Sequence, residues 1–365
     1  MATVRQRPAT ERIETIIESA QEEAQRTRER IRKGIDILLA RDEPKVGVTP
    51  KDIIYSRGTL KLYHYRPMTD EVYRVPVIFV MSLVSKPWIL DLTFGQSFIQ
   101  YMLAQGFDVF MIDWGIPRPE DKRLRFEDYV QDFIPACIEH VQAATGEEDF
   151  SILGYCMGGQ LALMYAATNL DAPLKNLVCA ATPVDMNGMG LFKHWVNQKT
   201  FDVDRLVDTV GNIPPEMMLR SFEMLRPMDR WGGYIRLIDN LWDPQFVYGF
   251  RIMYKWTNEQ IPFPGETYRQ MVKDMMWENK LATGEMIVGG KRVELSKITV
   301  PVMHAMAEHD HIAPYAASAP LTKLVGSEDT EDVLLKGGHV SLVAGKNAVG
   351  RLWPKVADWL SHRSL

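Results

Sequence analysis

The segment from Gly154 to Gly159 places a thiol between glycines and reads GYCMGG. It follows the apolar run from Phe150 to Leu153 and precedes helix-forming residues. A nucleophile on a sharp turn between strand and helix needs glycine two positions before and two after it, because the two backbones approach closely. The positive end of the following helix would also favour a thiolate. We therefore predict that Cys156 is a nucleophile standing where serine is more common.

Two later residues are in the right order along the chain to complete a catalytic triad. Asp310 follows an expected strand from Val300 to Met306, and His339 follows another from Val333 to Leu335. In this arrangement the acid comes after a late strand and the histidine after the last one. We predict that His339 is the base and that Asp310 orients it.

The other histidines and cysteines are less suited to catalysis. His309 and His311 flank the acid, but no third ligand accompanies them at a spacing suited to zinc. Cys137 and Cys179 lie in apolar helix and strand patterns, so they are expected to be core residues. Five further histidines lie inside strand or helix patterns and are expected to be structural or exposed: His64, His140, His194, His304 and His362.

An oxyanion hole would need two backbone donors. The N–H of Met157, directly after the nucleophile, is the expected first donor. The second should come from the turn after an early strand, here Val75 to Met81, and Val84 occupies that turn. Met157 and Val84 are therefore the predicted oxyanion donors.

The elements that must position these residues alternate between strand and helix. Expected strands and helices, in chain order, cover residues 109–112, 126–143, 150–153, 160–167 and 177–181, and later 300–306, 314–324, 333–335 and 347–360. Such alternation is typical of a mostly parallel sheet covered by helices on both faces. With the elbow and the order of the triad, it predicts an α/β-hydrolase fold.

Four segments are expected from the change of pattern along the chain. Residues 1–45 contain a long amphipathic helix, which either packs on its own domain or docks a partner subunit. Residues 46–185 and 296–365 form the two parts of the core, and residues 186–295 form a mainly helical cap. Five tryptophans of the cap either exclude water from the site or simply form the cap's own core: Trp195, Trp231, Trp242, Trp256 and Trp277.

Composition excludes several other classes of protein. The chain has 365 residues and a net charge of -5, which provides no field for gathering nucleic acid. It has three cysteines and no apolar stretch suited to a membrane span or a secretory signal, so a cytoplasmic location is expected. No cofactor or metal is expected.

These motifs resemble the catalytic subunit of polyhydroxyalkanoate synthases, which polymerise hydroxyacyl-CoA. Besides the elbow, the resemblance rests on segments reading KPWILDL, DVFMIDWG, GNIPP, GETYRQ, DHI and GHVS, and it covers the chain from about Val46 to its end. The length is similar to that of the two-subunit synthases of classes III and IV, and the segments around Asp310 and His339 are closer to class IV. One departure is Ser85, where the family has asparagine.

The resemblance implies that Cys156 carries the growing chain as a thioester and that 3-hydroxybutyryl-CoA is the substrate. It also implies a small accessory subunit, a homodimer and a location on the surface of polyester granules. Two alternatives remain open. One is a cysteine-dependent hydrolase or thioesterase on the same fold, and the other is a granule-coating protein without activity.

Overall fold

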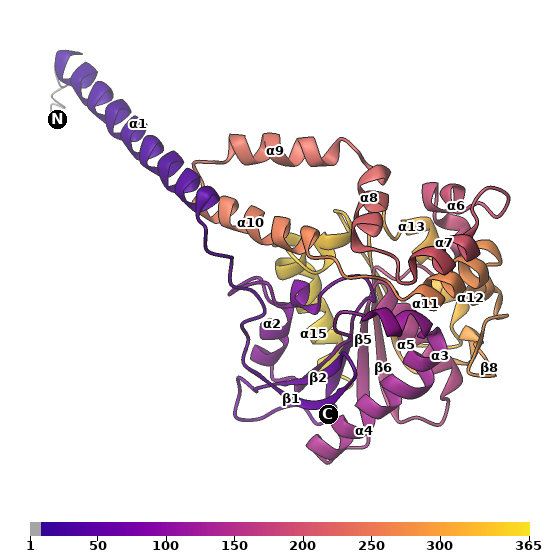
Figure 1. Cartoon of the computed structure of the whole chain (residues 1–365). Coiled ribbons are helices and arrows are strands. Elements are labelled where there is room, and N and C mark those ends of the chain that lie inside the picture. Colours follow the sequence, from indigo (N-terminus) through magenta and orange to yellow (C-terminus); the bar gives the residue numbers. More distant parts are fainter. Residues whose placement is uncertain (1–8) are drawn as a thin grey trace. The chain divides into compact units, whose positions relative to one another are not determined.

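The computed structural model describes residues 9–365, although the side chains of residues 9–16 are outside the description. Between those ends an eight-stranded sheet has the order β1-β2-β4-β3-β5-β6-β9-β10 (Figure 1). Strands β1 and β2 pair antiparallel, as do β2 and β4, and every other pairing in this sheet is parallel. The expected mostly parallel sheet is therefore confirmed.

The central strands are buried on both faces. Every residue of β3, β5 and β9 is buried, as expected for parallel strands covered by helices. The strands are β1 Lys51–Arg57, β2 Leu60–Tyr65, β3 Val77–Val80, β4 Val109–Asp113, β5 Phe150–Tyr155, β6 Leu174–Ala180, β9 Val302–Ala307 and β10 Thr330–Leu335.

Helices cover both faces of this sheet. In Figure 1, α2 and α15 lie on one side of β5 and β6, and α5 lies on the other. The ring of Phe98 in α2 stacks on that of Trp353 in α15, with centroids 5.3 Å apart. The core helices are α2 Phe98–Ala104, α3 Phe126–Asp128, α4 Ile134–Thr145, α5 Met157–Thr168, α13 Tyr315–Ser318, α14 Leu321–Leu324 and α15 Trp353–Ser361.

Prolines change three of the predicted helices. The helix expected over residues 126–143 contains a π-helical turn, Tyr129–Phe133, just before Pro135, and the last helix contains another, Ala348–Leu352, before Pro354. Proline cannot donate the usual backbone hydrogen bond, and a widened turn accommodates that loss. The helix expected over residues 314–324 is divided into α13 and α14 at Pro320 for the same reason.

Short helices follow β6, as predicted for an insertion. They are α6 Leu191–Trp195, α7 Val203–Val210, α8 Pro215–Leu225, α11 Gly265–Gln270, a π-helical segment Met271–Trp277 and α12 Lys280–Thr283. A small hairpin, β7 Ile287–Val288 and β8 Lys291–Arg292, then leads back to the core. The assignment of residues 186–295 to one cap stays a prediction.

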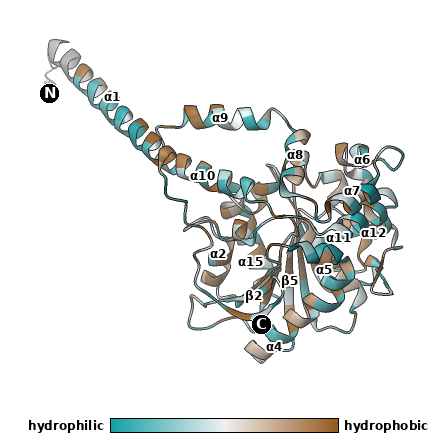
Figure 2. Cartoon of the chain, viewed as in Figure 1, coloured by the Kyte–Doolittle hydropathy of each residue, from teal (hydrophilic) through white to brown (hydrophobic). Residues whose placement is uncertain are grey.

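The chain divides into two compact units. One contains the N-terminal segment up to Lys45 together with Pro227–Thr257, and the other contains Val46–Arg226 and Asn258–Leu365. The first unit holds the long helix α1 Ala9–Leu39, with α9 Asp229–Asp239 and α10 Pro244–Asn258. The helix predicted at the N-terminus is thus present, and Figure 2 shows hydrophilic and hydrophobic residues along it.

Only part of α1 is packed within its unit. A Cβ on Gly34 would lie 1.8 Å from the carbonyl oxygen of Leu241, so the two backbones are in close contact there. Ile17, Ile31 and Ile35 are nevertheless exposed. Helices in residues 9–365 are nowhere both long and apolar enough to cross a bilayer.

Candidate active site

Cys156 stands on a strained turn between β5 and α5. Its backbone has φ 56° and ψ -122°, a conformation that residues other than glycine rarely adopt. A Cβ on Gly154 would lie 2.5 Å from the Cα of Gly159, and one on Gly158 would lie 2.0 Å from the carbonyl oxygen of Val80. The turn therefore requires glycine at these positions, and it holds the thiol at the carboxyl end of the sheet.

Asp310 and His339 lie together beyond the ends of β9 and β10. The Nδ1 atom of His339 is 2.8 Å from Oδ2 of Asp310, and both side chains are buried. The other carboxylate oxygen accepts the backbone N–H groups of Ile312 at 2.9 Å and Ala313 at 2.8 Å. The carboxylate is fixed from two sides, and this fixes the ring of His339 as well.

Cys156 lies close enough to His339 to affect its pKa, so the structure brings the three predicted triad residues together. Burial lowers the pKa of His339, but the nearby Asp310 and Cys156 outweigh that effect and raise it to about 10. Such a pair can exist as imidazolium and thiolate, the nucleophilic form of cysteine.

The other two thiols are in a different environment. Cys137 and Cys179 are fully buried, whereas Cys156 is partly exposed. Burial raises the pKa of both buried thiols to about 12. They are therefore core residues with little thiolate at neutral pH.

The predicted oxyanion donors line the same cavity as the thiol. Val84 follows β3, and its carbonyl accepts the N–H of Ile261 at 3.4 Å, which ties this turn to the segment before α11. Met157 is the first residue of α5, so its N–H has no partner within the helix. Ser85, the departure from the expected asparagine, is buried beside this turn.

The cavity in front of Cys156 has a volume of about 190 Å³ and is mostly apolar. Methionine and phenylalanine side chains supply most of its wall, including Met186, Met189, Phe192, Met217, Phe222, Met271 and Met276. Of the five tryptophans between residues 186 and 295, Trp195 lines this cavity. Trp277 lines a neighbouring cavity, and the other three belong to the unit that contains residues 227–257.

Sequence reasoning missed several residues of this wall. Ser82, Gln160 and Ile312 border the cavity, and so do the methionines between residues 186 and 276. Gln160 is buried and donates to the carbonyl of Pro183 at 2.7 Å. Its place directly after the glycines of the elbow was the available signal. The methionines gave no signal in the sequence. They lie on several short helices that are far apart along the chain, and only the packing of those helices brings them together.

The histidines beside the acid are not part of a metal cluster. Within the described residues, no group of three or more His, Cys, Asp or Glu side chains is arranged to hold a metal ion. His304 is fully buried in β9, and burial lowers its pKa to about 3. It therefore stays neutral, as the structural role expected from the sequence requires.

Comparison with known proteins decides the family. A model of the alpha/beta hydrolase fold matches residues 87–345, and one described as the N-terminus of poly-beta-hydroxybutyrate polymerase matches residues 43–102. The chain is 36% identical to the poly(3-hydroxyalkanoate) polymerase subunit PhaC of Allochromatium vinosum over 91% of this chain and 94% of that one. The chain belongs to the poly(3-hydroxyalkanoate) polymerases. This is a family of acyltransferases, and the resemblance seen in the motifs is confirmed.

Other polymerases of the family are similar over much of the chain. Identity is 37% to the PhaC subunit of Haloferax mediterranei, over 88% of this chain and 66% of that one. The Synechocystis subunit is 32% identical over 92% of this chain and 91% of its own length. This polymerase-family chain thus spans about two thirds of the Haloferax protein and nearly all of the Allochromatium and Synechocystis proteins.

Solved structures of other enzymes share the fold. A monoglyceride lipase from Saccharomyces cerevisiae superposes with a TM-score of 0.53 at 16% identity, covering 89% of this chain and 99% of the lipase. The monoacylglycerol lipase of Paleococcus ferrophilus gives 0.52 at 17% identity, with 82% and 99% covered. The α/β-hydrolase fold predicted for this polymerase-family chain is therefore confirmed.

Proposed function

We propose that this chain polymerises (R)-3-hydroxyacyl-CoA, with 3-hydroxybutyryl-CoA as its substrate, into polyhydroxyalkanoate with release of CoA. The observation that carries the proposal is a cysteine on the nucleophile elbow that lines an apolar cavity and lies beside a buried histidine and aspartate pair. Membership of the polymerase family supports the choice of reaction.

In the loading step, the thiolate of Cys156 attacks the thioester carbonyl of the substrate. A bond forms between Sγ and the acyl carbon, and the bond from that carbon to the sulfur of CoA breaks. The leaving thiolate takes the proton held by His339, so CoA departs as a thiol. One thioester replaces another, which makes this step nearly balanced and reversible. The N–H groups of Met157 and Val84 are the proposed donors to the oxyanion.

In the elongation step, the hydroxyl of another 3-hydroxyacyl unit attacks the thioester on Cys156. His339 takes the hydroxyl proton, an oxygen ester forms and the thiolate of Cys156 is released. Asp310 keeps Nδ1 of His339 protonated, so that Nε2 is the atom that accepts and returns the proton. A serine ester would hold the chain more tightly than repeated transfer requires.

Polymerisation requires that water does not reach the thioester. The small apolar cavity around Cys156 supports this, since its wall of methionine, phenylalanine and Trp195 side chains contains no charged residue among the described residues. Exclusion of water separates a transferase from a hydrolase on the same fold. We propose that residues 186–295 act as the cap that provides it.

We also propose that a small accessory subunit binds α1 and that the active enzyme is a homodimer at the surface of polyester granules. Support for the first point comes from the exposed apolar side chains of α1, including Ile17, Ile31 and Ile35. Deleting the residues before Val46 should abolish co-purification with the subunit while leaving the core folded. Retained binding would contradict this role for α1.

The first experiment mixes the purified chain with 3-hydroxybutyryl-CoA, with and without a small subunit of the class III or class IV type. Release of CoA is followed together with the acyl product. Insoluble polyester that disappears with Cys156→Ala supports the polymerase. Free 3-hydroxybutyrate would instead identify a thioesterase, and no release of CoA would indicate a chain without this activity.

A further inference from the structure

A second cavity lies beside the catalytic one. Its volume is about 780 Å³, and Met276 borders both cavities. The short helix α6 and the residue after it stand between them. Phe192, Trp195 and Val196 line the catalytic cavity, whereas their sequence neighbours Lys193, His194 and Asn197 line the second one.

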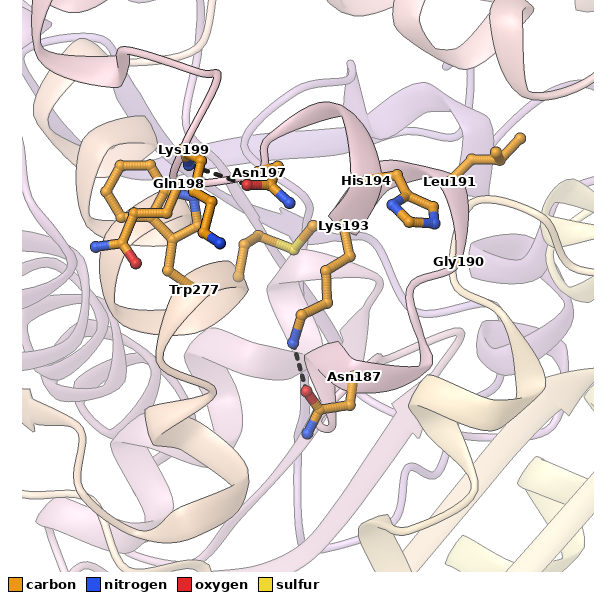
Figure 3. Close-up of a pocket in the computed structure, with 10 residues that line it drawn as sticks. Asn187, Gly190, Leu191, Lys193, His194, Asn197, Gln198, Lys199 and Trp277 are labelled. Atoms are coloured by element: carbon orange, nitrogen blue, oxygen red, sulfur yellow. Dashed lines mark hydrogen bonds between the residues drawn. The ribbon is translucent and has the colours of Figure 1, made fainter.

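The lining of this second cavity is cationic and rich in amides. Figure 3 shows Lys193 reaching towards Asn187, with Lys199, Gln198 and Trp277 gathered on the opposite side from His194. Lys193 donates to the amide oxygen of Asn187, and the backbone N–H of Lys199 donates to Asn197 at 2.9 Å. No carboxylate is among the described lining residues, and no ion pair of the described chain involves either lysine.

Nearby acidic groups are already engaged. Asp274 and Glu278, which flank Met276 and Trp277, both pair with Lys280, at 2.6 and 2.8 Å. Asp185 accepts hydrogen bonds from the backbone of Asn187 and the side chain of Asn279. The charge of the two lysines is thus left for a ligand, and that ligand should be anionic.

The size of the catalytic cavity also indicates that part of the substrate binds outside it. A volume of about 190 Å³ without a charged wall can hold a short acyl group but not the phosphates and adenine of CoA. On the proposed function, that nucleotide must rest outside the catalytic cavity while its thioester reaches Cys156. A cationic cavity that shares the lining residue Met276 with the catalytic one is suitably placed.

We propose that the cavity lined by Lys193, Lys199 and Trp277 binds the phosphorylated nucleotide end of CoA. The lysines contact phosphate oxygens, and the indole of Trp277 offers a flat apolar surface to the adenine. That indole is held in place by its N–H, which donates to the carbonyl of Val196. The proposal rests on the proposed function, because CoA is taken as the carrier of the acyl group.

A rival cavity of about 580 Å³ contains Lys51, Lys61, Lys86 and Arg118. Its cations are largely engaged, since Lys86 pairs with Glu259 at 2.9 Å and Arg118 with Glu120 at 3.5 Å. It also contains Asp113, and none of its described lining residues borders the catalytic cavity. It is therefore the less suitable place for a nucleotide whose arm must reach Cys156.

The test measures binding of free CoA and of dephospho-CoA by calorimetry to four proteins: the full chain, Lys193→Gln, Lys199→Gln, and Lys61→Gln as the matched control from the rival cavity. Each of the first two variants should weaken CoA binding by about tenfold, and loss of a phosphate contact should make binding less sensitive to salt. Lys61→Gln should bind as the unmodified chain does. Thermal unfolding checks that all variants are folded.

Kinetics then separate nucleotide binding from chemistry. With 3-hydroxybutyryl-CoA the two variants should raise KM by a similar factor, whereas with 3-hydroxybutyryl-pantetheine, which has no nucleotide, KM should not change. The binding data overturn the proposal if the unmodified chain does not bind CoA, if the two variants bind it normally, or if Lys61→Gln is the weakened variant. The kinetic data overturn it if the KM values for both substrates change equally. Normal CoA binding that depends on the two lysines, without acyl transfer, would instead refute the proposed function alone.

Discussion

The Nδ1 atom of His339 lies 2.8 Å from Oδ2 of Asp310, while the other oxygen of that carboxylate accepts two backbone N–H groups. Three hydrogen bonds to one carboxylate thus hold the buried pair in a single arrangement. The carboxylate fixes which nitrogen of the ring carries the proton, and the opposite nitrogen is left for Cys156. The orienting role of Asp310 can therefore be tested by a substitution that leaves the nucleophile Cys156 in place.

Replacing Asp310 with Asn tests that role. The amide can still accept the N–H groups of Ile312 and Ala313, but its NH₂ would face Nδ1 of His339 and favour the wrong tautomer. We expect kcat for release of CoA to fall roughly a thousandfold or more, with little change in KM. Asp332→Asn, at an exposed site on β10, is the control. Activity within a few-fold of the unmodified enzyme would contradict an orienting role for Asp310.

The pKa of His339 predicts how stability depends on pH. Folding raises this pKa from 6.5 to about 10, mainly because Asp310 and Cys156 outweigh the effect of burial. The resulting contribution to the free energy of unfolding is fully present below pH 6.5 and is lost as the pH rises towards 10. Urea unfolding of the unmodified chain and of His339→Gln should therefore differ most at pH 6 and least at pH 10. A difference that stays constant or grows with pH would refute the coupling.

The sequence carried the information for the core of the site but not for its walls. The glycines around Cys156, and the acid and histidine after the last two strands, are local signals, and the fold brings these residues together. The helices differ from the predicted ones where proline intervenes, as at Pro135 and Pro320. These positions widen or divide a helix without changing its apolar pattern, so periodicity does not reveal them.

The region between β6 and β9 could be predicted only as mainly helical. Residues far apart in sequence, such as Met186 and Met271, line one cavity because short helices pack around it. Asn279 illustrates the cause: it has φ 54°, is buried, and accepts the backbone N–H of Met186 at 2.7 Å. A single side chain thus connects segments 93 residues apart. Neither the composition nor the spacing of residues in this region predicts that contact.

The environments of the three cysteines predict selective alkylation. Cys137 and Cys179 are buried with pKa values raised to about 12 from 9.0, so their thiolate fraction is about a thousandfold smaller than that of an ordinary thiol. Iodoacetamide at pH 8 should modify Cys156 in the native protein and all three thiols after unfolding in urea. Mass spectrometry of tryptic peptides gives the extent at each site. Modification of Cys179 at a rate similar to Cys156 in the native protein would contradict this assignment.

The contact between Gly158 and β3 predicts a large effect from one added methyl group. A Cβ on Gly158 would lie 2.0 Å from the carbonyl oxygen of Val80, and β3 leads directly into the turn that carries Val84. Gly158→Ala must therefore push the elbow, which carries the N–H of Met157, away from Val84, the other proposed oxyanion donor. We expect the free energy of unfolding to fall by about 2–4 kcal/mol and kcat to fall at least a hundredfold.

Gly350→Ala is the matched control, because a Cβ there meets nothing within 4 Å in a helical segment. Its free energy of unfolding should stay the same or rise slightly, since alanine is the better helix former. Urea unfolding and the rate of CoA release are measured on both variants. If Gly158→Ala unfolds at the urea concentration of the unmodified chain, the elbow and β3 are not in the close contact described, and the proposed oxyanion hole loses its structural basis.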